Sequence, residues 1–507
     1  MELKYPVGIQ DFRTLIEGGN VYVDKTERIY RILQRGSYYF LARPRRFGKS
    51  LLIATLKELY SGSAELFEGL WIAGHWDFAQ QDRPVIWLKF ALSGEKAVGL
   101  EAAILALLNG EARRLGLTLP RQTVEYALVD LIEGASKLTG KRIVLLIDEY
   151  DKPIIDHLDD LGRVETNRSI LKRFYSGIKD SGSHLELVFI TGVTAFAKVS
   201  IFSDLNNLRN LSLAREANSL VGITEAELDR YFSEPLAQFD RGLVRRWYNG
   251  YSWTGEERVY NPWSLFNFLL DGRFGNYWFA TGTPTFLIHQ LRSRNDYDVS
   301  RTKAYEPQLL SFIPEALDPI VVMFQTGYLT VVDYDPMRQA YTLDFPNLEV
   351  NQALRQALLN SYVERSTTNI SPTVLPLKLE ESLQIGDIEQ GIHLLNGLFA
   401  DLPYDTWRNN HEAIYHAVIH LVFSILGIYV RSEVHSANGR ADVVLEMDDY
   451  IYVLEFKLDQ PVAIALQQIE ARDYFGPFAA DPRRKIGVGI SFSSEQKAIV
   501  DWQIVDY

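Results

Sequence analysis

Two acidic residues and a lysine near the C-terminus have the types and spacing of a phosphodiesterase site. Asp442 follows Gly439-Arg440-Ala441, and Glu455 and Lys457 stand two apart in the next apolar segment. Carboxylate oxygens bind hard cations such as Mg²⁺ and Mn²⁺, while a lysine can position or activate the attacking water and stabilise the charge that develops on a phosphate. The pattern therefore predicts a metal-dependent site that cleaves phosphodiester bonds.

The segments around these residues predict a small α/β domain in the order helix, three strands, helix, strand. Asp448-Asp449 is a tight polar step between two runs rich in Val, Ile, Leu and Tyr, which is typical of a hairpin with one buried face. Asp442 would lie on the first strand of that hairpin, and Glu455 and Lys457 on the second. The expected elements are a helix over 413–429, strands over 430–435, 441–447 and 450–458, a helix over 461–475 and a strand over 485–492.

This arrangement resembles the PD-(D/E)XK nuclease superfamily over about the last quarter of the chain. The resemblance places Glu412 on the first helix, and Gln468 with Tyr474 on the helix after the hairpin. It implies a metal held by the two hairpin carboxylates and a water assisted by Lys457. Glu412 would add a water-mediated metal ligand, and Gln468 would orient the substrate or a metal-bound water.

Histidines beside Glu412 raise other possibilities. His411 and His416 are five residues apart, whereas a zinc-protease helix needs two histidines four apart, so the spacing argues against a zinc protease. Glu412, His416 and His420 share one helical face, which leaves open a metal cluster or partly buried histidines bonded to neighbouring polar groups. The same apolar run is almost long enough to cross a membrane, but two histidines and a serine interrupt it, which favours a buried core helix.

A second phosphate-binding pattern lies near the N-terminus, in the run Arg-Pro-Arg-Arg-Phe-Gly-Lys-Ser over 43–50. It stands between an expected strand over 37–42 and an expected helix over 51–60. This order predicts a P-loop, in which backbone N–H groups and the helix N-terminus hold the β- and γ-phosphates of a nucleotide. Lys49 would neutralise the phosphates, and Ser50 would reach Mg²⁺. The residues expected to contact the nucleotide are Arg45, Arg46, Phe47, Gly48, Lys49 and Ser50.

A Walker B strand is predicted by the apolar run over 143–147, which ends in Asp148-Glu149. A continuous apolar run is typical of a strand buried on both faces. Asp148 would order Mg²⁺ and its waters, and Glu149 would polarise the attacking water. Another apolar strand carries Thr191 and Thr194 at its end, and either threonine would be placed to sense the γ-phosphate.

The first half of the chain alternates strands with helical stretches. This alternation predicts a mostly parallel sheet covered by helices on both faces. Beyond the segments above, the expected elements are strands over 84–90 and 185–193 and helices over 101–115 and 170–181.

Several motifs together resemble the bacterial AAA-ATPase-like family, in which an arginine-rich P-loop joins a C-terminal PD-(D/E)XK domain. An arginine at position 43, where a P-loop usually has its first glycine, is expected within that family. The resemblance runs over nearly the whole chain and implies ATP and Mg²⁺ at the first site, with Mg²⁺ or Mn²⁺ at the second. The motifs cover 8–12, 22–26, 43–50, 148–153, 191–193, 202–208, 247–251 and 260–264.

The net charge of the 507 residues is −13, which argues against a protein that coats nucleic acid through general electrostatics. Any contact with DNA or RNA must then be local. Arg43, Arg45 and Arg46 are expected to meet nucleotide phosphate. The candidates for a nucleic-acid backbone are Arg241, Arg245 and Arg246 and the run 483–485, although each is equally compatible with a solvated basic face.

Composition and the N-terminus favour a cytoplasmic enzyme. The chain has no cysteine, which excludes disulfides and thiolate metal sites and suits a reducing cytoplasm. Residues 1–6 contain neither a basic start nor an apolar stretch, so no signal peptide and no membrane association are expected. Hydrophobic residues make up 47% of the chain and charged residues 23%, which is enough for sizeable cores in about three domains.

The expected fold class is α/β, with a P-loop AAA-type ATPase core, a helical and winged-helix-like middle region, and a restriction-endonuclease-like α/β domain. The core would cover 1–235 and end near Ser233-Glu234-Pro235. The middle region would cover 236–375, with a hairpin over 327–332 and 339–345. A linker over 366–376 and a helical stretch over 377–399 would lead into a nuclease-like domain over 376–507.

These features predict an ATP-binding and ATP-hydrolysing protein coupled to a Mg²⁺-dependent nuclease that acts on DNA or RNA. The alternative is a regulatory switch or interaction protein whose nuclease-like domain binds without cutting, although a complete Asp442, Glu455 and Lys457 set weighs against it. A P-loop kinase or transferase is a third class, but Asp148-Glu149 suits water attack better. If an arginine of a neighbouring copy completed the ATP site, the protein would act as a homo-oligomer. The sequence singles out no such arginine.

Overall fold

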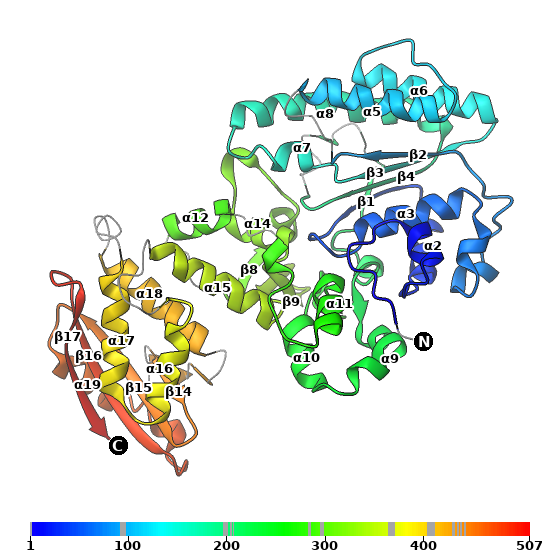
Figure 1. Cartoon of the computed structure of the whole chain (residues 1–507). Helices are drawn as coiled ribbons and strands as arrows, with labels where there is room; N and C mark the ends of the chain where they lie inside the picture. The colour runs from blue at the N-terminus through cyan, green and yellow to red at the C-terminus, as the bar shows by residue number, and fades with distance from the viewer. Residues whose placement is uncertain are drawn as a thin grey trace. The chain divides into compact units, whose positions relative to one another are not determined.

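The computed structural model describes residues 3–91, 98–195, 201–202, 205, 207–281, 285–294, 299–363, 371–402, 411–427, 431–432, 435–436, 439–440 and 443–507. The chain forms two compact units (Figure 1). The first comprises 1–282 and 300–350, and the second comprises 283–299 and 351–507. The ATPase core predicted over 1–235 and most of the predicted middle region thus share the first unit.

A five-stranded parallel sheet in the order β2-β3-β4-β1-β5 forms the core of the first unit. Its strands are β1 (Tyr38–Ala42), β2 (Val85–Lys89), β3 (Ile143–Asp148), β4 (Leu185–Gly192) and β5 (Arg209–Asn210), and its helices include α1 (Phe12–Glu17), α2 (Thr26–Leu33), α3 (Lys49–Tyr60), α5 (Leu100–Arg114), α6 (Val124–Thr139), α7 (Lys152–Ile155) and α8 (Leu161–Asp180). In Figure 1, α5, α6 and α8 lie on one face of the sheet, and α2 and α3 on the other. β3 is buried throughout, as a strand covered on both faces must be. The predicted parallel sheet with helices on both faces is confirmed.

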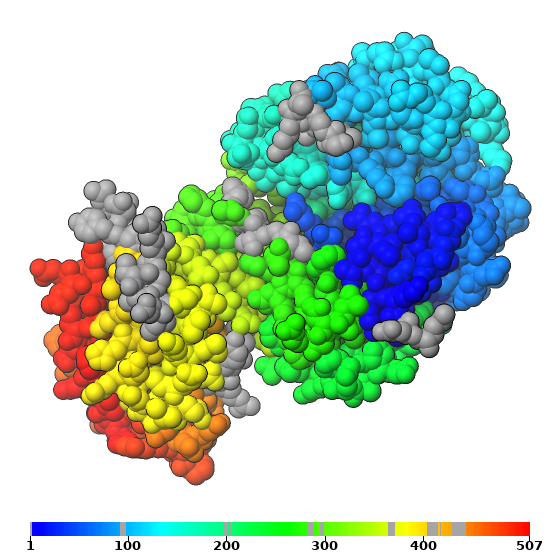
Figure 2. Space-filling view, in the orientation of Figure 1, coloured from blue at the N-terminus to red at the C-terminus, as the bar shows by residue number. Residues whose placement is uncertain are grey.

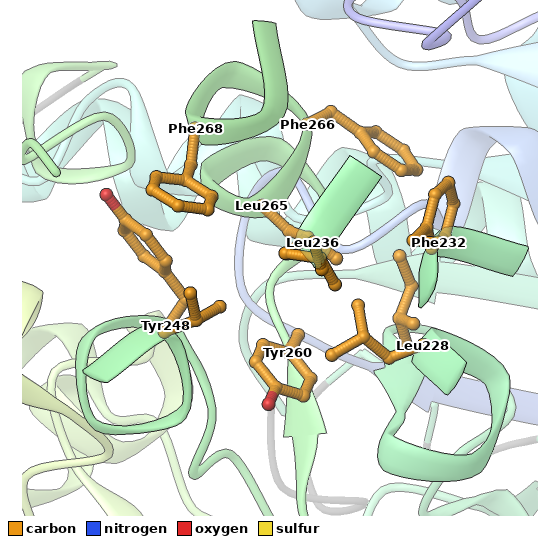
Figure 3. Close-up of a cluster of buried hydrophobic side chains, with 10 residues drawn as sticks. Leu228, Phe232, Leu236, Tyr248, Tyr260, Leu265, Phe266 and Phe268 are labelled. Atoms are coloured by element: carbon orange, nitrogen blue, oxygen red, sulfur yellow. The ribbon is translucent and has the colours of Figure 1, made fainter. Parts of the chain in front are cut away.

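A helical region of the same unit packs around one apolar cluster, shown in Figure 3. Its elements are the paired strands β6 (Ile223–Thr224) and β7 (Val259–Tyr260) and the helices α9 (Glu225–Leu236), α10 (Arg241–Tyr248) and α11 (Pro262–Asp271). Thr224 and Glu227 form a capping box at the start of α9, and Asn261 caps α11 ahead of Pro262. The domain break predicted near Ser233-Glu234-Pro235 falls within the last turn of α9, so the chain stays helical there.

The N-terminal segment lies against this helical region. Tyr5 packs on Phe232 of α9 and Phe266 of α11, with ring centroids 6.2 and 6.1 Å away. Figure 2 shows the dark blue N-terminal residues beside the green residues of α9 to α11. The segment that precedes the sheet is therefore held by helices that follow it in the sequence.

A three-stranded antiparallel sheet completes the first unit, in the order β8-β10-β9. Its strands are β8 (Thr302–Tyr305), β9 (Thr330–Asp335) and β10 (Ala340–Asp344), accompanied by the helices α13 (Glu306–Leu309) and α14 (Pro319–Thr326). β9 and β10 form the hairpin predicted around Asp335-Pro336. β9 lies three residues later than the strand predicted over 327–332, and β10 is one residue shorter at each end than the strand predicted over 339–345.

Glu349 stands in the first turn of α15 (Leu348–Tyr362) and has no exposed surface. Its Oε1 accepts a hydrogen bond of 2.6 Å from the backbone N–H of Trp278. Burial raises the pKa of Glu349 to about 7, because a low-dielectric surrounding disfavours the ionised carboxyl. The side chain thus fastens the start of α15 to the chain segment that carries Trp278.

The second unit contains a mixed sheet in the order β11-β14-β15-β16-β17, in which β15 and β16 are parallel and the other pairs antiparallel. The elements are α12 (Thr285–Arg294), the remainder of α15, α16 (Leu375–Gln384), α17 (Ile388–Ala400), α18 (His411–Leu426), β11 (Arg431–Ser432), β12 (His435–Ser436), β13 (Gly439–Arg440), β14 (Val443–Glu446), β15 (Tyr450–Leu458), α19 (Val462–Ala471), β16 (Arg484–Ser493) and β17 (Ala498–Asp506). The predicted order of helix, strands, helix and strand is present, and β17 adds an edge strand that the sequence did not indicate.

Two details of the second unit differ from expectation. The helical stretch predicted over 377–399 is two helices, α16 and α17, separated at Gly386, whose φ of +81° is a left-handed conformation that favours glycine. α16 already begins at Leu375, inside the predicted linker. Among the described helices, none combines the length and apolar content that a membrane crossing requires.

The stability of the helical region of the first unit should depend on its buried apolar cluster. Phe268 and Leu270 lie on the same helix, but Phe268 has no exposed surface and Leu270 is 57% exposed. Phe268→Ala should lower the free energy of unfolding by about 3–5 kcal/mol, because it removes buried contacts and leaves a cavity. Urea denaturation checks this, and Leu270→Ala is the matched control, with an expected change within about 0.5 kcal/mol. Equal losses in both variants would contradict the packing in Figure 3.

The buried carboxyl of Glu349 should make stability fall as pH rises. Between the ordinary glutamate pKa and about 7, the unfolded chain releases a proton that the folded chain keeps, so ionisation favours unfolding. Glu349→Gln removes this effect. Relative to the wild type, the variant should gain up to about 3 kcal/mol of stability on going from pH 5 to pH 8.

Urea unfolding at pH 5 and pH 8 measures this difference. The exposed Glu68, changed to Gln, controls for the loss of one carboxylate from the same unit. An identical pH dependence in wild type and Glu349→Gln would show that the carboxyl ionises in the folded state as it does in the unfolded chain.

Candidate functional site

The loop between β1 and α3 has the backbone geometry of an anion site. Gly48 has a φ of +94°, and Arg46 a φ of +67°, so two left-handed residues turn the chain sharply just before Lys49. α3 starts at Lys49 without a hydrogen bond from a capping side chain. The first amides of a helix bind an anion readily when no side chain caps them.

Lys49 lies inside this loop and is only 7% exposed. Its Nζ donates hydrogen bonds to the backbone oxygens of Arg43 and Pro44, at 2.8 and 2.9 Å. Burial lowers the pKa of Lys49, while the nearby carboxylates of Asp148 and Asp151 oppose that effect. The ammonium group is therefore held by carbonyls of its own loop, opposite an acidic wall.

The acidic wall comes from the end of β3. Asp148 is 3% exposed, and its Oδ1 accepts a hydrogen bond of 2.6 Å from Thr191 Oγ1 on the neighbouring strand β4. Glu149 follows with a φ of +55°, a strained conformation for a residue with a side chain. Burial and the adjacent Asp148 raise the pKa of Glu149, which makes it a stronger proton acceptor than an exposed glutamate.

A cavity of about 480 Å³ opens in front of these groups. Its wall includes six of the predicted site residues: Arg45, Arg46, Gly48, Lys49, Ser50 and Glu149. Phe47, Asp148 and Thr191 are not part of this wall, and Phe47 lines the smaller cavity that adjoins it. Phe47 is 1% exposed and packs edge-on against Tyr251 and Trp253, so it anchors the loop to these two aromatic residues.

Arg43 has a different place from the other loop arginines. It has no exposed surface, and its guanidinium donates to the carbonyls of Ala42, Ser212 and Ala217 at 2.7 to 2.8 Å. The same group lies 3.8 Å from the centre of the Trp253 ring. Burial lowers the pKa of Arg43 to about 9, so the cation persists at neutral pH. Arg43 was expected to meet nucleotide phosphate, but it faces the protein interior and anchors the loop.

The other two arginines stay on the cavity side. The guanidinium of Arg46 rests on the ring of Trp263, 4.1 Å from its centre. The backbone oxygen of Arg45 accepts a hydrogen bond of 3.1 Å from the indole of Trp278. The loop is thus supported by Trp263 of α11 and by Trp278, the residue that Glu349 holds.

Several residues of the cavity wall were not given a role by the sequence. The segment 6–10, Pro262, Trp263 and Phe266 of α11, and Asp151 with Lys152 all line it. Residues 8–12 and 260–264 carried motifs of the family resemblance, but a motif does not say which distant loop it meets. A smaller apolar cavity of about 90 Å³ adjoins the first and shares Pro6, Gly48, Leu51, Pro262 and Phe266 with it.

A second polar group lies in the other unit, at β15 and α19. Lys457 Nζ donates to Glu455 Oε1 at 2.7 Å and to Gln468 Oε1 at 2.9 Å. Gln468 Nε2 in turn donates to Tyr474 Oη at 3.2 Å. Glu455 is 1% exposed, and its spacing of two from Lys457 places both side chains on the same face of β15. Four of the residues named by the nuclease resemblance are therefore brought together.

The remaining members of that set lie wholly or partly outside the described residues. Asp442 lies outside the described residues, and Glu412 belongs to α18 but its side chain is outside them, as is that of His416. Within the side chains that the structure does describe, no three His, Asp or Glu residues meet as a metal cluster. The metal ligands proposed from the sequence at this site thus remain predictions.

Most of the arginines named as candidates for nucleic-acid contact are paired with acids. Arg241 and Arg245 both reach Glu225, at 3.1 Å each. Arg483 reaches Glu446 and Asp481, and Arg484 reaches Asp506, at 2.7 Å in each case. These pairs offset the positive charge that the sequence suggested at both places.

Comparisons with known proteins agree with both halves of this description. The family described as "Predicted AAA-ATPase" matches residues 6–202, and the PD-(D/E)XK nuclease superfamily matches residues 410–502. A protein of Azotobacter chroococcum mcd 1, described as "Uncharacterized protein in vnfD 5'region", is 37% identical over 516 aligned positions, which cover 99% of this chain and 98% of the relative. No solved structure matches the chain. The chain therefore belongs to the AAA-ATPase-like family with a C-terminal PD-(D/E)XK nuclease superfamily domain, as the resemblance of its motifs predicted.

Proposed function

We propose that the chain binds and hydrolyses ATP at the cavity of the first unit and that this site controls a Mg²⁺-dependent nuclease site in the second. The observation that carries the first part is the meeting of Lys49, Ser50 and Glu149 on one cavity wall, at the N-terminus of α3. A helix start that no side chain caps, a lysine and a carboxylate with a raised pKa are what phosphate binding and water attack require.

The phosphates would lie along the loop. Lys49 would exchange its bonds to the carbonyls of Arg43 and Pro44 for bonds to the β- and γ-phosphates. Arg45 and Arg46 stand on the same wall and would add positive charge. The small apolar cavity beside Gly48 and Leu51 suits the flat apolar face of a nucleotide base.

Mg²⁺ would be held by Ser50 and Asp148, and when bound it would neutralise phosphate charge. Thr191 orients the Asp148 carboxylate through its hydrogen bond, which is an indirect contribution to the metal site. Glu149 would take the proton of the attacking water, since its raised pKa brings it nearer to neutral pH.

The link between the two sites would run through the helical region, which we propose acts as a lid with a winged-helix-like part. The indole of Trp278 donates a hydrogen bond to the backbone oxygen of Arg45 in the P-loop. The backbone N–H of Trp278 donates a second hydrogen bond to the carboxylate of Glu349. Glu349 lies in the first turn of α15, and the residues of α15 from 351 onward belong to the second unit. A change in the loop on nucleotide binding would therefore be felt at the start of a helix that both units share.

In the second unit, Asp442 and Glu455 would hold Mg²⁺ or Mn²⁺, with Glu412 as a water-mediated ligand. Lys457 would assist the attacking water on a DNA or RNA phosphodiester. Gln468 contacts Lys457 directly, so it would position the lysine as well as orient water or substrate. We place this activity in the cytoplasm and leave a homo-oligomer open as the assembled form.

The ATP site should separate binding from hydrolysis. Lys49→Ala should weaken ATP binding about 10- to 100-fold, because charge-assisted bonds to phosphate are lost. Glu149→Gln should keep ATP affinity but slow hydrolysis about 10²- to 10⁴-fold. Equilibrium binding of a fluorescent ATP analogue and release of phosphate measure the two effects. Lys57→Ala, on the same helix but outside the cavity, is the control, and matching losses in Lys57→Ala and Lys49→Ala would contradict the assignment.

The nuclease site should depend on metal and on Lys457. Lys457→Met should lower cleavage of DNA or RNA about 10²- to 10⁴-fold, and removal of divalent metal with EDTA should abolish it. Cleavage is followed on gels with Mg²⁺ or Mn²⁺, with and without ATP. Lys378→Met, an exposed lysine on α16, is the control.

Equal cutting by wild type, Lys457→Met and Asp442→Ala would reject the nuclease assignment. Absence of cutting by the wild type, together with ATP-dependent binding of nucleic acid or protein that Lys49→Ala loses, would favour the alternative of a switch whose nuclease-like domain binds without cutting.

A further inference from the structure

Asp151 stands three residues beyond the proposed metal ligand of β3 and is almost wholly buried, with 1% of its surface exposed. Its Oδ2 accepts three hydrogen bonds from the loop that follows β4. The donors are Val193 N at 2.9 Å, Thr194 N at 2.6 Å and Thr194 Oγ1 at 2.7 Å. One carboxylate oxygen thus fixes two consecutive residues of another loop.

Tyr150, the neighbour of Asp151, strengthens the same link. Its backbone N–H donates to Thr191 O at 3.1 Å, and its Oη donates to Thr194 O at 3.0 Å. Gly192 leaves room for both residues, because a Cβ there would come within 2.4 Å of the Tyr150 ring and 2.8 Å of Asp151 Oδ1. The turn after β3 and the loop after β4 are therefore joined as one structural piece.

That piece borders the cavity at the end where the phosphates would lie. Glu149, Asp151 and Val193 all line the cavity opposite Lys49. Glu149 sits in a strained left-handed conformation immediately before Tyr150, so its direction depends on how the following turn is held. A loss of the bonds from Asp151 would release Val193 and Thr194 and also the support beneath Glu149.

We infer that Asp151 is a positioning residue that locks the loop after β4 to the turn bearing Glu149, so that ATP turnover, rather than ATP affinity, depends on it. This inference rests on the proposed ATPase function. Affinity would come from the P-loop, which Asp151 influences through the charge of its carboxylate near Lys49, whereas its hydrogen bonds go to Val193 and Thr194. Turnover requires the attacking water, its base and the phosphate to be aligned, and a displacement of about 1 Å can cost about 100-fold in rate.

Asp151→Asn tests the inference because asparagine keeps the shape but removes the negative charge, so the bonds that its single amide oxygen can accept from Val193 and Thr194 are weaker. It should lower kcat about 30- to 100-fold and leave ATP affinity within about threefold of the wild type. Thr194→Val removes only the hydroxyl donor and should lower kcat roughly 3- to 10-fold. Amide hydrogen exchange at Val193 and Thr194, measured without nucleotide, should become faster in Asp151→Asn.

Glu58→Gln is the matched control, since Glu58 is also a buried carboxylate with three partners, Arg13, Ser63 and Lys57, at 2.8 to 2.9 Å. Glu58 lies near the C-terminal end of α3. Glu58→Gln should lower the stability of the protein without changing kcat per folded molecule. All rates are compared at a temperature at which each variant is fully folded.

Unchanged amide exchange in Asp151→Asn, or a loss of affinity as large as the loss of kcat, would overturn the positioning role. A drop in kcat equal to that of Glu58→Gln would do the same, because it would mark a general structural effect. Failure of the proposed ATPase function would be seen separately, as absence of ATP binding by the wild type itself, and the exchange measurement would still decide whether Asp151 holds the loop.

Discussion

The register of three parallel strands is the constraint on which the candidate nucleotide site depends. β4 lies between β1 and β3, with Ala42 opposite Gly192 and Ile147 opposite Ile190. Parallel strands all end at the same edge of a sheet, so the loops that follow them meet there. The P-loop, the acidic end of β3 and the loop after β4 are thereby brought together from distant parts of the sequence. The hydrogen bonds from Thr191 to Asp148 at the end of β3, and from Thr194 to Asp151 in the turn that follows, then set the details of an arrangement that the register already imposes.

Arg43 shows how this loop keeps its shape without the first glycine of a usual P-loop. A buried cation is costly unless its donors find partners, and here three carbonyls accept bonds from the two terminal nitrogens of the guanidinium, the face of Trp253 lies against it, and Nε is left without a partner among the described residues. Ala42 ends β1, but Ser212 and Ala217 follow β5 and Trp253 lies between α10 and β7, so the loop is also tied to the region that follows the sheet. The loop therefore owes its conformation partly to tertiary bonds, and only Gly48 and Arg46 need left-handed backbone angles at the turn itself.

The sequence predicted what depends on local pattern and missed what depends on distant partners. β1, β3 and β4 could be predicted because a strand buried on both faces needs a continuous apolar run. Glu455 and Lys457 could be paired because a spacing of two places them on one face of a strand. β17 was missed because an edge strand with an exposed side carries a weaker apolar pattern, as the exposed Asp501 and Gln503 of this strand illustrate. The inward direction of Arg43 and the contribution of residues 6–10 to the cavity depend on contacts across the fold, which no local pattern encodes.

The lysines of the two candidate sites are both hydrogen-bonded to acceptors of the protein itself. Lys49 is bonded to carbonyls of its own loop, and Lys457 to Glu455 and Gln468, so each ammonium group already has protein acceptors at 2.7 to 2.9 Å. A phosphate that binds must replace these acceptors, so the gain is the difference between two sets of charge-assisted bonds. The net charge of −13 and the pairing of Arg483 and Arg484 with acids leave little general attraction for a polyanion near the second site. A divalent metal beside Glu455 would shift that balance, because it would draw the carboxylate away from Lys457 and free the ammonium for the phosphate, so metal and phosphate would bind more strongly together than either alone.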